Sequence, residues 1–325
     1  MSVSIFLFRR ICQSIFIVFL MSIVVFISVY AIGNPVDVLI SPDSTPDERL
    51  KIISELGLDK SLFDQYQIFV QNLFQGNLGI SFVHNRPAIL LIIERLPATL
   101  ELTFCALLIA IVLGIPLGLL AGIYSDKVLS RWIMTTSVFF YSLPTFFVGI
   151  LLIVFFCVHL NWLPTSGRGD TVIVLGHDFS FLTRDGLFHI LLPAINLSLY
   201  PLALVIRLTA TSTQETLPLD FIKFAKARGL NETRIIFVHL LKYILIPILT
   251  MIGLQFSVIF AFSVITERIF AWPGMGRLII ESITLLDRPV IVAYLMVTVT
   301  VFMIVNLVVD IFYCILDPRV RIENV

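Results

Sequence analysis

The sequence predicts an all-α integral membrane protein with six transmembrane helices, and two observations support this fold class. First, hydrophobic residues make up 58% of the 325 residues and charged residues only 14%, and the mean hydropathy is +1.01. A soluble domain is nearer half apolar and a quarter charged, so disordered, collagenous and nucleic-acid-binding classes are excluded. Second, six apolar stretches reach the length of about 20 residues that a helix needs to cross the hydrocarbon of a bilayer.

Short charged segments separate the six stretches. The first stretch follows Arg9 and Arg10, and it is too long and lacks the small-residue cleavage site of a signal peptide, so we interpret it as a retained helix. The predicted spans run from Ile11 to about Ile32, between Glu101 and Asp126, from after Arg131 to Asn161–Pro164, from about Leu187 to Thr213, between Lys242 and Glu267, and from about Pro289 to Leu316.

The distribution of Lys and Arg predicts the orientation. With six spans, both termini lie on one side of the membrane. Most Lys and Arg residues of the short loops fall on that side, whereas the opposite short loops hold Arg168, Arg184, Arg268, Arg277 and Arg288. Since positive charge concentrates in cytoplasmic loops, both termini are predicted to be cytoplasmic.

The long segment 33–95 between the first two spans is predicted to be external and helical. Thr45 and Glu48 have the spacing of a capping box, and Gly57 suits a helix end. A second helix is indicated by an apolar stripe at helical spacing: Leu62, Tyr66, Phe69, Val70, Leu73 and Phe74. The segment is either a small cap on the membrane surface or a docking platform for an external partner. The remaining parts are residues 1–32, a five-span module 96–316 and a tail 317–325.

The loop 214–242 is the largest cytoplasmic loop and carries the clearest functional signal. Asp220 suits a helix start and Gly229 a helix end, with Phe221, Phe224 and Ala225 expected on one face. Its basic residues alone could simply satisfy the positive-inside rule and contact anionic lipid headgroups. That reading leaves the small residues Ala225, Ala227 and Gly229 unexplained, together with His239 and Pro247 further along.

Asp220 through Pro247 resembles the cytoplasmic signature loop of bacterial ABC importer permeases. The version with Ala225-x-Ala227-Arg228-Gly229, then His239 and Pro247, is similar to the dipeptide/oligopeptide/nickel permease group. It departs from the general signature at Lys223 and Phe224, where many importers carry Glu and Ala. Further matches span the chain: Gly57–Asp59, Gly76–Ser81, Leu96–Leu102, Ser142–Phe147, Leu163–Arg168, Thr266–Arg277, Asp287–Val290 and Asp317–Arg319.

The resemblance implies a type I ABC importer permease fold in which 96–316 is the permease module and 214–242 the coupling loop. It implies four kinds of partner: a second homologous permease, two cytoplasmic ATPase subunits, an external substrate-binding protein and the lipid bilayer of a bacterial inner membrane. No Gly-Lys dipeptide occurs, so a Walker-A loop is absent and ATP with its magnesium would be bound by the ATPase subunits. We expect Ala225 and Gly229, with Asp220, Phe221, Phe224, Ala227 and Arg228, to contact an ATPase.

No catalytic or metal centre is predicted. The sequence contains no Gly-x-Ser-x-Gly or His-Glu-x-x-His motif, and its four cysteines and five histidines show no paired spacing. A di- or oligopeptide is the expected cargo, with nickel chelate, glutathione or haem as alternatives. The competing class is a non-transporting structural subunit or an intramembrane hydrolase, which would be expected to bury several ionisable groups midway through its helices.

Asp310 is the one carboxylate inside the sixth predicted span. An ionisable residue in a membrane helix normally has a partner. Counting residues from the span starts places Asp310 and Arg207 at similar depths, about 30 Å along their helices. Asp310 is therefore predicted to pair with Arg207 or with a donor on the second permease, the alternative being a solvated position near the helix end.

Overall fold

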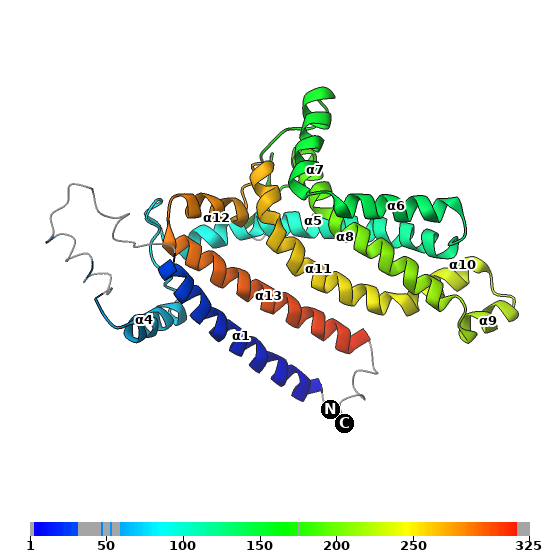
Figure 1. Cartoon of the computed structure of the whole chain (residues 1–325), viewed down its shortest axis with the longest axis horizontal. Coiled ribbons are helices and arrows are strands. Elements are labelled where there is room, and N and C mark those ends of the chain that lie inside the picture. The colour runs from blue at the N-terminus through cyan, green and yellow to red at the C-terminus, as the bar shows by residue number, and fades with distance from the viewer. Residues whose placement is uncertain (1–2, 32–46, 48–52, 54–58, 175, 317–325) are drawn as a thin grey trace.

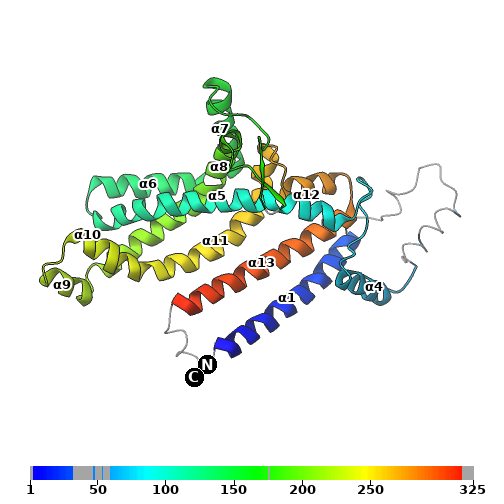
Figure 2. The same cartoon turned by 180° about the vertical axis from the view of Figure 1, so that it is seen from behind.

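The computed structural model describes residues 3–31, 47, 53, 59–174 and 176–316. Figure 1 shows long helices running roughly side by side, with the short helices α4 and α12 toward one end and α9 and α10 at the other. The beginning of α1 and the end of α13 lie toward the same end as α9, as Figure 2 shows from behind. The element bounds are α1 Val3–Ala31, α4 Leu62–Phe74, α5 Ala88–Ile123, α6 Val128–Ser142, α7 Thr145–Leu152, η1 Ile153–His159, β1 Val172–Val174, β2 His177–Phe179, α8 Arg184–Thr216, α9 Asp220–Ala227, α10 Glu232–Arg234, η2 Ile235–Leu240, α11 Leu241–Ile269, α12 Met275–Thr284 and α13 Arg288–Leu316.

The predicted spans correspond to long apolar helices. Among the described residues, five helices are long and apolar enough to cross a membrane, and a sixth span results if the bent pair α6 and α7–η1 is counted as one. Helices α8, α11 and α13 extend the predicted fourth, fifth and sixth spans by a few residues. Helix α5 begins at Ala88 and continues through Pro97, so it crosses the boundary drawn at residue 96.

The close pairing of α5 with α8 forms the centre of the bundle. Three glycines one turn apart on α5 face three α8 residues at the same spacing: a Cβ on Gly114 would lie 2.7 Å from Val205, and one on Gly118 or Gly122 would lie 2.5 Å from Thr209 or Thr213. All six positions are buried. Because lipid tails are as apolar as Leu, small residues that permit close backbone approach are a main source of helix association in membranes.

The third predicted span is not continuous, which corrects the sequence prediction. Helix α6 ends at Ser142 and α7 begins at Thr145, with a bend of 102° between the two helical segments. Leu143 is extended, with φ −80° and ψ 135°. The cause is Pro144, whose ring disfavours helical geometry in the preceding residue and which has no N–H to continue the ladder. As a result, α7 turns sharply away from the direction of α6 (Figure 1) and packs against α8 and α11.

The external segment contains the predicted second helix, α4, whose N-cap Ser61 accepts a hydrogen bond from the Asp64 N–H. One face of α4 packs on α1: Tyr66 and Phe69 contact the Phe26 ring, and the Tyr66 and Ser22 hydroxyls lie 2.9 Å apart. Leu62 and Phe74, from the same predicted stripe, are exposed. The proposed capping box at Thr45–Glu48, apart from Asp47, and Gly57 fall outside the described residues.

A small β-hairpin departs from the all-α prediction. Strands β1 and β2 pair antiparallel, with Ile173 opposite Asp178. Together they contain six residues and lie before α8 at the end opposite α9. The hairpin is too short to form a core of its own, so side-chain contacts with α5, described below, are needed to hold it.

Replacing Gly118 by Val should destabilise the bundle. The added Cβ would lie 2.5 Å from the Thr209 Cβ and 2.7 Å from the Ile206 carbonyl oxygen, so α8 would have to move away. Overpacking of this kind costs about 1–3 kcal/mol, and thermal unfolding of the purified protein should occur at a lower temperature. Leu120→Val on the exposed side of α5 is the matched control; an unchanged melting temperature for Gly118→Val would contradict the close contact.

Candidate functional site

The loop 214–242 contains a short helix, α9 (Asp220–Ala227), that ends with a well-defined capping motif. Gly229 has φ +71° and follows the last helical residues. Its N–H donates to the Lys226 carbonyl at 2.9 Å, and the Leu230 N–H donates to the Ala225 carbonyl at 3.3 Å. These two bonds form a Schellman motif, which favours glycine because its central residue is left-handed. The predicted helix bounds, from Asp220 to a stop at Gly229, are confirmed.

The inner face of α9 packs into the main core of the bundle. Ile222 and Ala225 are 0% and 5% exposed and cluster with Ile235, Leu240 and Ile244 from the beginning of the next long helix. The Ala225 side chain is enclosed by this chain, which argues against its predicted role in contacting an ATPase; that contact stays a prediction. The small size of Ala225 lets α9 lie close against the bundle.

The outer face of α9 is open. Phe224 is 64% exposed, and the Arg228 guanidinium lies over its ring at 5.6 Å. Phe221, one turn before Ala225, is 39% exposed and contacts Tyr243 of α11 with ring centroids 5.3 Å apart, so of the three residues expected on one face it is Phe224 that points away from the bundle. The other exposed positions of the motif are Asp220, which pairs with Lys223 at 3.2 Å, Ala227 and Gly229, beside which a Cβ would meet no atom within 4 Å.

Helix α9 connects two long helices that are themselves joined. It lies between α8 and the continuous helical run 232–269 that includes α11. On the far side of the bundle, the buried Asn196 amide of α8 donates to the Thr266 hydroxyl of α11 at 3.1 Å. Of the other two motif residues, His239 is half-buried in the π-helical turn η2, and Pro247 is exposed within α11. A displacement of α9 therefore acts on two membrane helices together.

Asp310 does not pair with Arg207. Its carboxylate lies 3.1 Å from Arg10 Nε, so the ion pair joins α13 to α1. Arg207 is exposed on α8. Counting residues along a helix gave the depth of Asp310 but not the side of the bundle it faces. The predicted pairing with Arg207 is therefore wrong. A donor on the second permease stays a prediction, and the alternative of a solvated position near the helix end is compatible with the 24% exposure of the Asp310 side chain.

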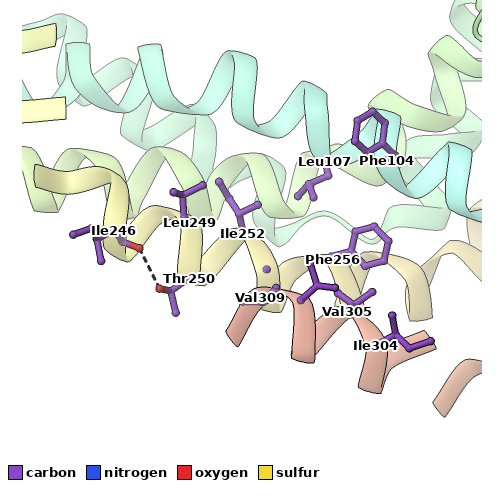
Figure 3. Close-up of a pocket in the computed structure, with 12 residues that line it drawn as sticks. Phe104, Leu107, Ile246, Leu249, Thr250, Ile252, Phe256, Ile304, Val305 and Val309 are labelled. Atoms are coloured by element: carbon purple, nitrogen blue, oxygen red, sulfur yellow. Dashed lines mark hydrogen bonds between the residues drawn. The ribbon is translucent and has the colours of Figure 1, made fainter. Parts of the chain in front are cut away.

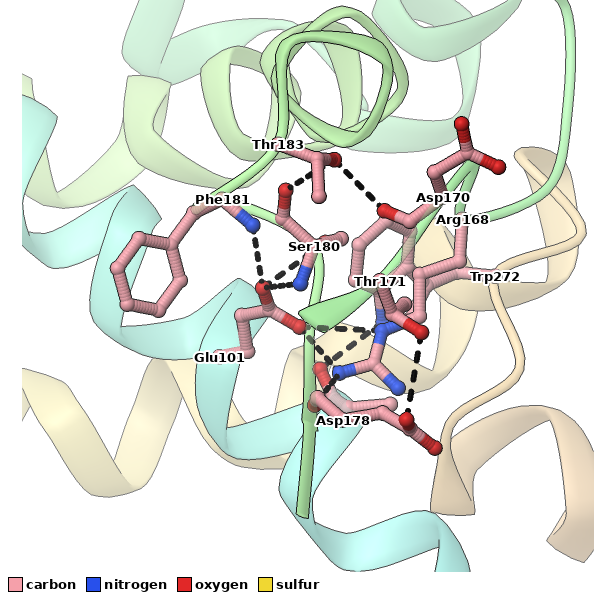
Figure 4. Close-up of polar contacts among 10 residues, drawn as sticks. Glu101, Arg168, Asp170, Thr171, Asp178, Ser180, Phe181, Thr183 and Trp272 are labelled. Atoms are coloured by element: carbon pink, nitrogen blue, oxygen red, sulfur yellow. Dashed lines mark hydrogen bonds and ion pairs between the residues drawn. The ribbon is translucent and has the colours of Figure 1, made fainter. Parts of the chain in front are cut away.

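At the end opposite α9, a buried carboxylate on α5 holds the β-hairpin. Glu101 Oε1 accepts hydrogen bonds from the Ser180 and Phe181 N–H groups, at 2.7 and 2.8 Å, and from the Ser180 hydroxyl. Its other oxygen pairs with Arg168, whose guanidinium also donates to the Asp178 carbonyl at 2.6 Å and lies over Trp272 (Figure 4). Sequence reasoning assigned no role to this cluster.

A second buried carboxylate, Glu267 on α11, fixes the turn between α11 and α12. It accepts from the Thr99 hydroxyl at 2.7 Å and the Arg277 N–H at 3.0 Å. A Cβ on Gly274 would lie 2.4 Å from the Glu267 carboxylate, so the turn can approach it only because this position is glycine. The turn thereby supplies N–H groups at the beginning of α12, where a negative charge is favoured.

A third buried carboxylate, Asp287, holds the segment before α5. Its oxygens accept from the Ser81 hydroxyl and from the Phe82 N–H, the latter at 3.1 Å. The three carboxylates lie in segments that the sequence analysis singled out, but their partners come from distant parts of the chain, as many as 206 residues away. In the sequence, the only sign of these sites is that each carboxylate adjoins an apolar stretch. The fold is needed to show which hydrogen-bond donors surround each one.

An apolar cavity of about 650 Å³ lies between α5, α11 and α13 (Figure 3). Its walls include Phe104, Leu107, Phe256 and Val305, and the Thr250 hydroxyl is already bonded to the Ile246 carbonyl at 3.1 Å. Buried peptide groups without hydrogen-bond partners are costly. The cavity therefore does not suit a peptide backbone.

Two family models together match most of the chain. One, described as the binding-protein-dependent transport system inner membrane component, matches residues 114–322, and its N-terminal counterpart matches residues 3–103. The chain belongs to this family of ABC importer permeases. The permease therefore is a transport subunit embedded in a membrane, and the alternative of a non-transporting structural subunit is set aside.

Curated relatives cover nearly the whole permease. It is 37% identical over 302 residues to the di/tripeptide transport system permease protein DppB of Pseudomonas aeruginosa strain UCBPP-PA14, covering 89% of this chain and 90% of the relative. It is 35% identical over 307 residues to the dipeptide transport system permease protein DppB of Escherichia coli K12, with the same coverage. The glutathione transport system permease protein GsiC of Escherichia coli O6:H1 is 33% identical over 317 residues, covering 97% and 98%. These relatives confirm the predicted dipeptide/oligopeptide group.

A solved structure confirms the fold. The inward-facing MetNI methionine ABC transporter matches with a TM-score of 0.54 at 16% identity, covering 70% of the permease and 96% of the matched chain. At this identity the likeness concerns architecture alone. The permease accordingly has the predicted type I ABC importer fold. Helix α1 packs against α13, and the hairpin is held by Glu101 of α5.

Replacing Arg168 by Met should release the hairpin. Glu101 is fully buried and Arg168 is 13% exposed, so the variant would leave a buried carboxylate without its cation, at a cost of about 3–5 kcal/mol. Limited proteolysis with mass spectrometry should show new cleavage within residues 169–183. Arg184→Met, an exposed arginine over Phe188, is the control; equal protection in both variants would show that the ion pair does not hold the hairpin.

Proposed function

We propose that the permease is one of two homologous permease subunits in a bacterial inner-membrane importer of di- or oligopeptides. An external binding protein delivers the peptide, and two cytoplasmic ATPase subunits bind and hydrolyse ATP with magnesium. This chain carries no cofactor and catalyses no reaction. The observation that carries the proposal is α9, a short helix fixed to the bundle on one face and exposed on the other.

Helix α9 is suited to transmit movement because it is held at both ends and along one side. Ile222 fixes its inner face, and the Gly229 cap sets a sharp stop. Phe224 and Arg228 together present an exposed aromatic ring and a stacked guanidinium. Aromatic residues and Arg are the side chains that most often anchor protein interfaces. A partner bound to this face would move α8 and α11 together. Such a movement is what alternating access requires, in which rigid helix bundles tilt relative to each other.

The predicted orientation places α9 on the cytoplasmic side with both termini. The beginning of α1, the end of α13 and α9 lie toward one end of the molecule (Figure 2). The loops at this end carry most of the Lys and Arg, in agreement with the positive-inside rule. The hairpin and α12 then face outward, where a binding protein would dock.

A small peptide is the cargo best supported by the relatives, two of which are named for di- or tripeptides and one for glutathione. Nickel chelates and haem have no counterpart among these three. The apolar cavity of Figure 3 offers no free polar group for a peptide. We therefore place the path between this permease and its partner permease, with selection mainly by the binding protein.

Phe224→Ala should weaken the contact with the ATPase while leaving the fold intact. The ring is 64% exposed, so its loss creates no cavity. Loss of an interface anchor costs about 2 kcal/mol or more, which is roughly a 30-fold weaker complex. Co-purification of the ATPase and peptide uptake should both fall. Lys223→Ala, the neighbouring exposed residue, is the control and should have little effect.

The two faces of α9 can be separated with charged variants. Ala225→Glu would bury a charge in the core and should reduce the amount of folded permease. Gly229→Glu would meet no neighbouring atom, so although a non-glycine residue at φ +71° strains the cap of α9, the protein should remain in the membrane without uptake. Normal uptake by Phe224→Ala and Gly229→Glu together would show that α9 is only a lipid contact.

The reconstituted importer, containing both permeases, the ATPases and the binding protein, provides the test of cargo. Binding protein loaded with a dipeptide should stimulate ATP hydrolysis in liposomes, and the same protein without peptide should not. Stimulation by glutathione but not by dipeptides would reassign the cargo. If no loaded binding protein stimulated hydrolysis, the import proposal itself would be refuted.

A further inference from the structure

Helix α1 lies at the margin of the bundle, alongside α13 (Figures 1 and 2). Toward the external end the two helices pack tightly, with Val25 buried against Val292 and Met296. Toward the other end they separate enough to enclose a cavity of about 550 Å³. The contact between α1 and the rest of the permease is therefore tight at one end and open at the other.

The cavity between the separated ends has a mixed lining, in which polar side chains are gathered beside apolar ones. Three of its residues, Arg10, Gln13 and Ser14, lie on one face of α1, and Asn306 and Asp310 lie one turn apart on α13. Arg10 and Asp310 form an ion pair at 3.1 Å, but their side chains remain 45% and 24% exposed. Polar and ionisable groups in membrane helices normally face protein or water and are rare toward lipid tails. Such a group of polar side chains at the margin of a bundle therefore suits a polar occupant that reaches it from the membrane.

An apolar cavity of about 1020 Å³ continues from the first one along α1 and α13, and at its far end it is closed by α4 and the beginning of α5. The two cavities share Ser14 and Phe16, and the larger extends along α1 to Ser22 and along α13 to Met296. From Arg10 to Ser22 the helix rises about 18 Å, which is about half the hydrocarbon thickness of a bilayer. The charged end and the apolar extension together have the length of one lipid leaflet.

We propose that this α1–α13 groove binds one phospholipid whose headgroup carries both a phosphate and an ammonium, as in phosphatidylethanolamine. The phosphate lies against Arg10, the ammonium against Asp310, and an acyl chain fills the apolar cavity. The Arg10 guanidinium is suited to phosphate oxygens, and the Asp310 carboxylate accepts hydrogen bonds from an ammonium. One positive and one negative side chain therefore face one negative and one positive group of the lipid. An anionic headgroup such as phosphatidylglycerol would meet Arg10 favourably but would be repelled by Asp310.

The lipid would complete the attachment of α1 to the permease module. At the Arg10 end the two helices meet through the Arg10–Asp310 ion pair, and the headgroup would add a second bridge beside it. This inference concerns lipid binding by the full chain and does not depend on the cargo.

Native mass spectrometry of the full-length permease, purified with its partner subunits and then supplied with phosphatidylethanolamine or phosphatidylglycerol, tests the proposal. The wild type should retain one phosphatidylethanolamine per chain, about tenfold more strongly than phosphatidylglycerol. Arg10→Gln should lower retention of phosphatidylethanolamine about tenfold, and Asp310→Asn should abolish the preference between the two lipids. Arg9→Gln is the matched control, because this neighbouring arginine does not line either cavity.

A second variant separates lipid binding from the ion pair. Thr300→Trp would fill the apolar cavity without touching Arg10 or Asp310, and it should also reduce retention, at an unchanged melting temperature. Equal retention of phosphatidylethanolamine by the wild type, Arg10→Gln and Thr300→Trp would overturn the proposal. So would equal retention of the two lipids by the wild type, or the absence of any retained lipid.

Discussion

The close contact between α5 and α8 is the constraint on which the rest of the permease depends. Gly118 and its neighbours one turn away allow the two backbones to approach until side chains of α8 fill the space where Cβ atoms would be. The pair is rigid because a packed contact of this kind does not deform gradually. Helix α5 carries Glu101, which holds the hairpin, and α8 leads directly into α9. The contact thereby joins the part of the bundle that carries the hairpin to the part that carries α9.

Three buried carboxylates hold short segments in place away from α9. Glu101, Glu267 and Asp287 lie in an apolar protein where an unsatisfied carboxylate would be very costly. Each is surrounded by backbone N–H groups and hydroxyls, and Glu101 also by a guanidinium. These contacts hold a hairpin, a turn and the segment before α5, which are otherwise too short to be stable alone. The middle of the bundle, in contrast, is held by packing.

Much of the fold was predictable from the sequence because it depends on local properties. The length of apolar runs gave the spans, and Asp220 and Gly229 gave the bounds of α9, since helix ends are encoded by nearby residues. The features that were missed depend on which surfaces meet. Ala225 was assigned to the outer face because periodicity alone does not tell which side of a helix packs inward. Asp310 was given the wrong partner because depth does not fix direction. The break at Pro144 carried a local signal, but the apolar run around it was long enough to suggest one straight helix.

That break has a consequence for biosynthesis of the permease. By helical rise, α6 and the α7–η1 segment are each about 22 Å long, which is short of the roughly 30 Å of hydrocarbon that a spanning helix must cover. A nascent chain leaving the ribosome presents this region before α8 and α11, the helices against which α7 packs, have been synthesised. The insertion machinery must therefore recognise the region by its continuous apolar character. Pro144 interrupts the helix locally, but the packing that holds α7 at 102° to α6 can form only later, as the downstream helices arrive. Membrane integration and final folding are thus separate events for this part of the chain.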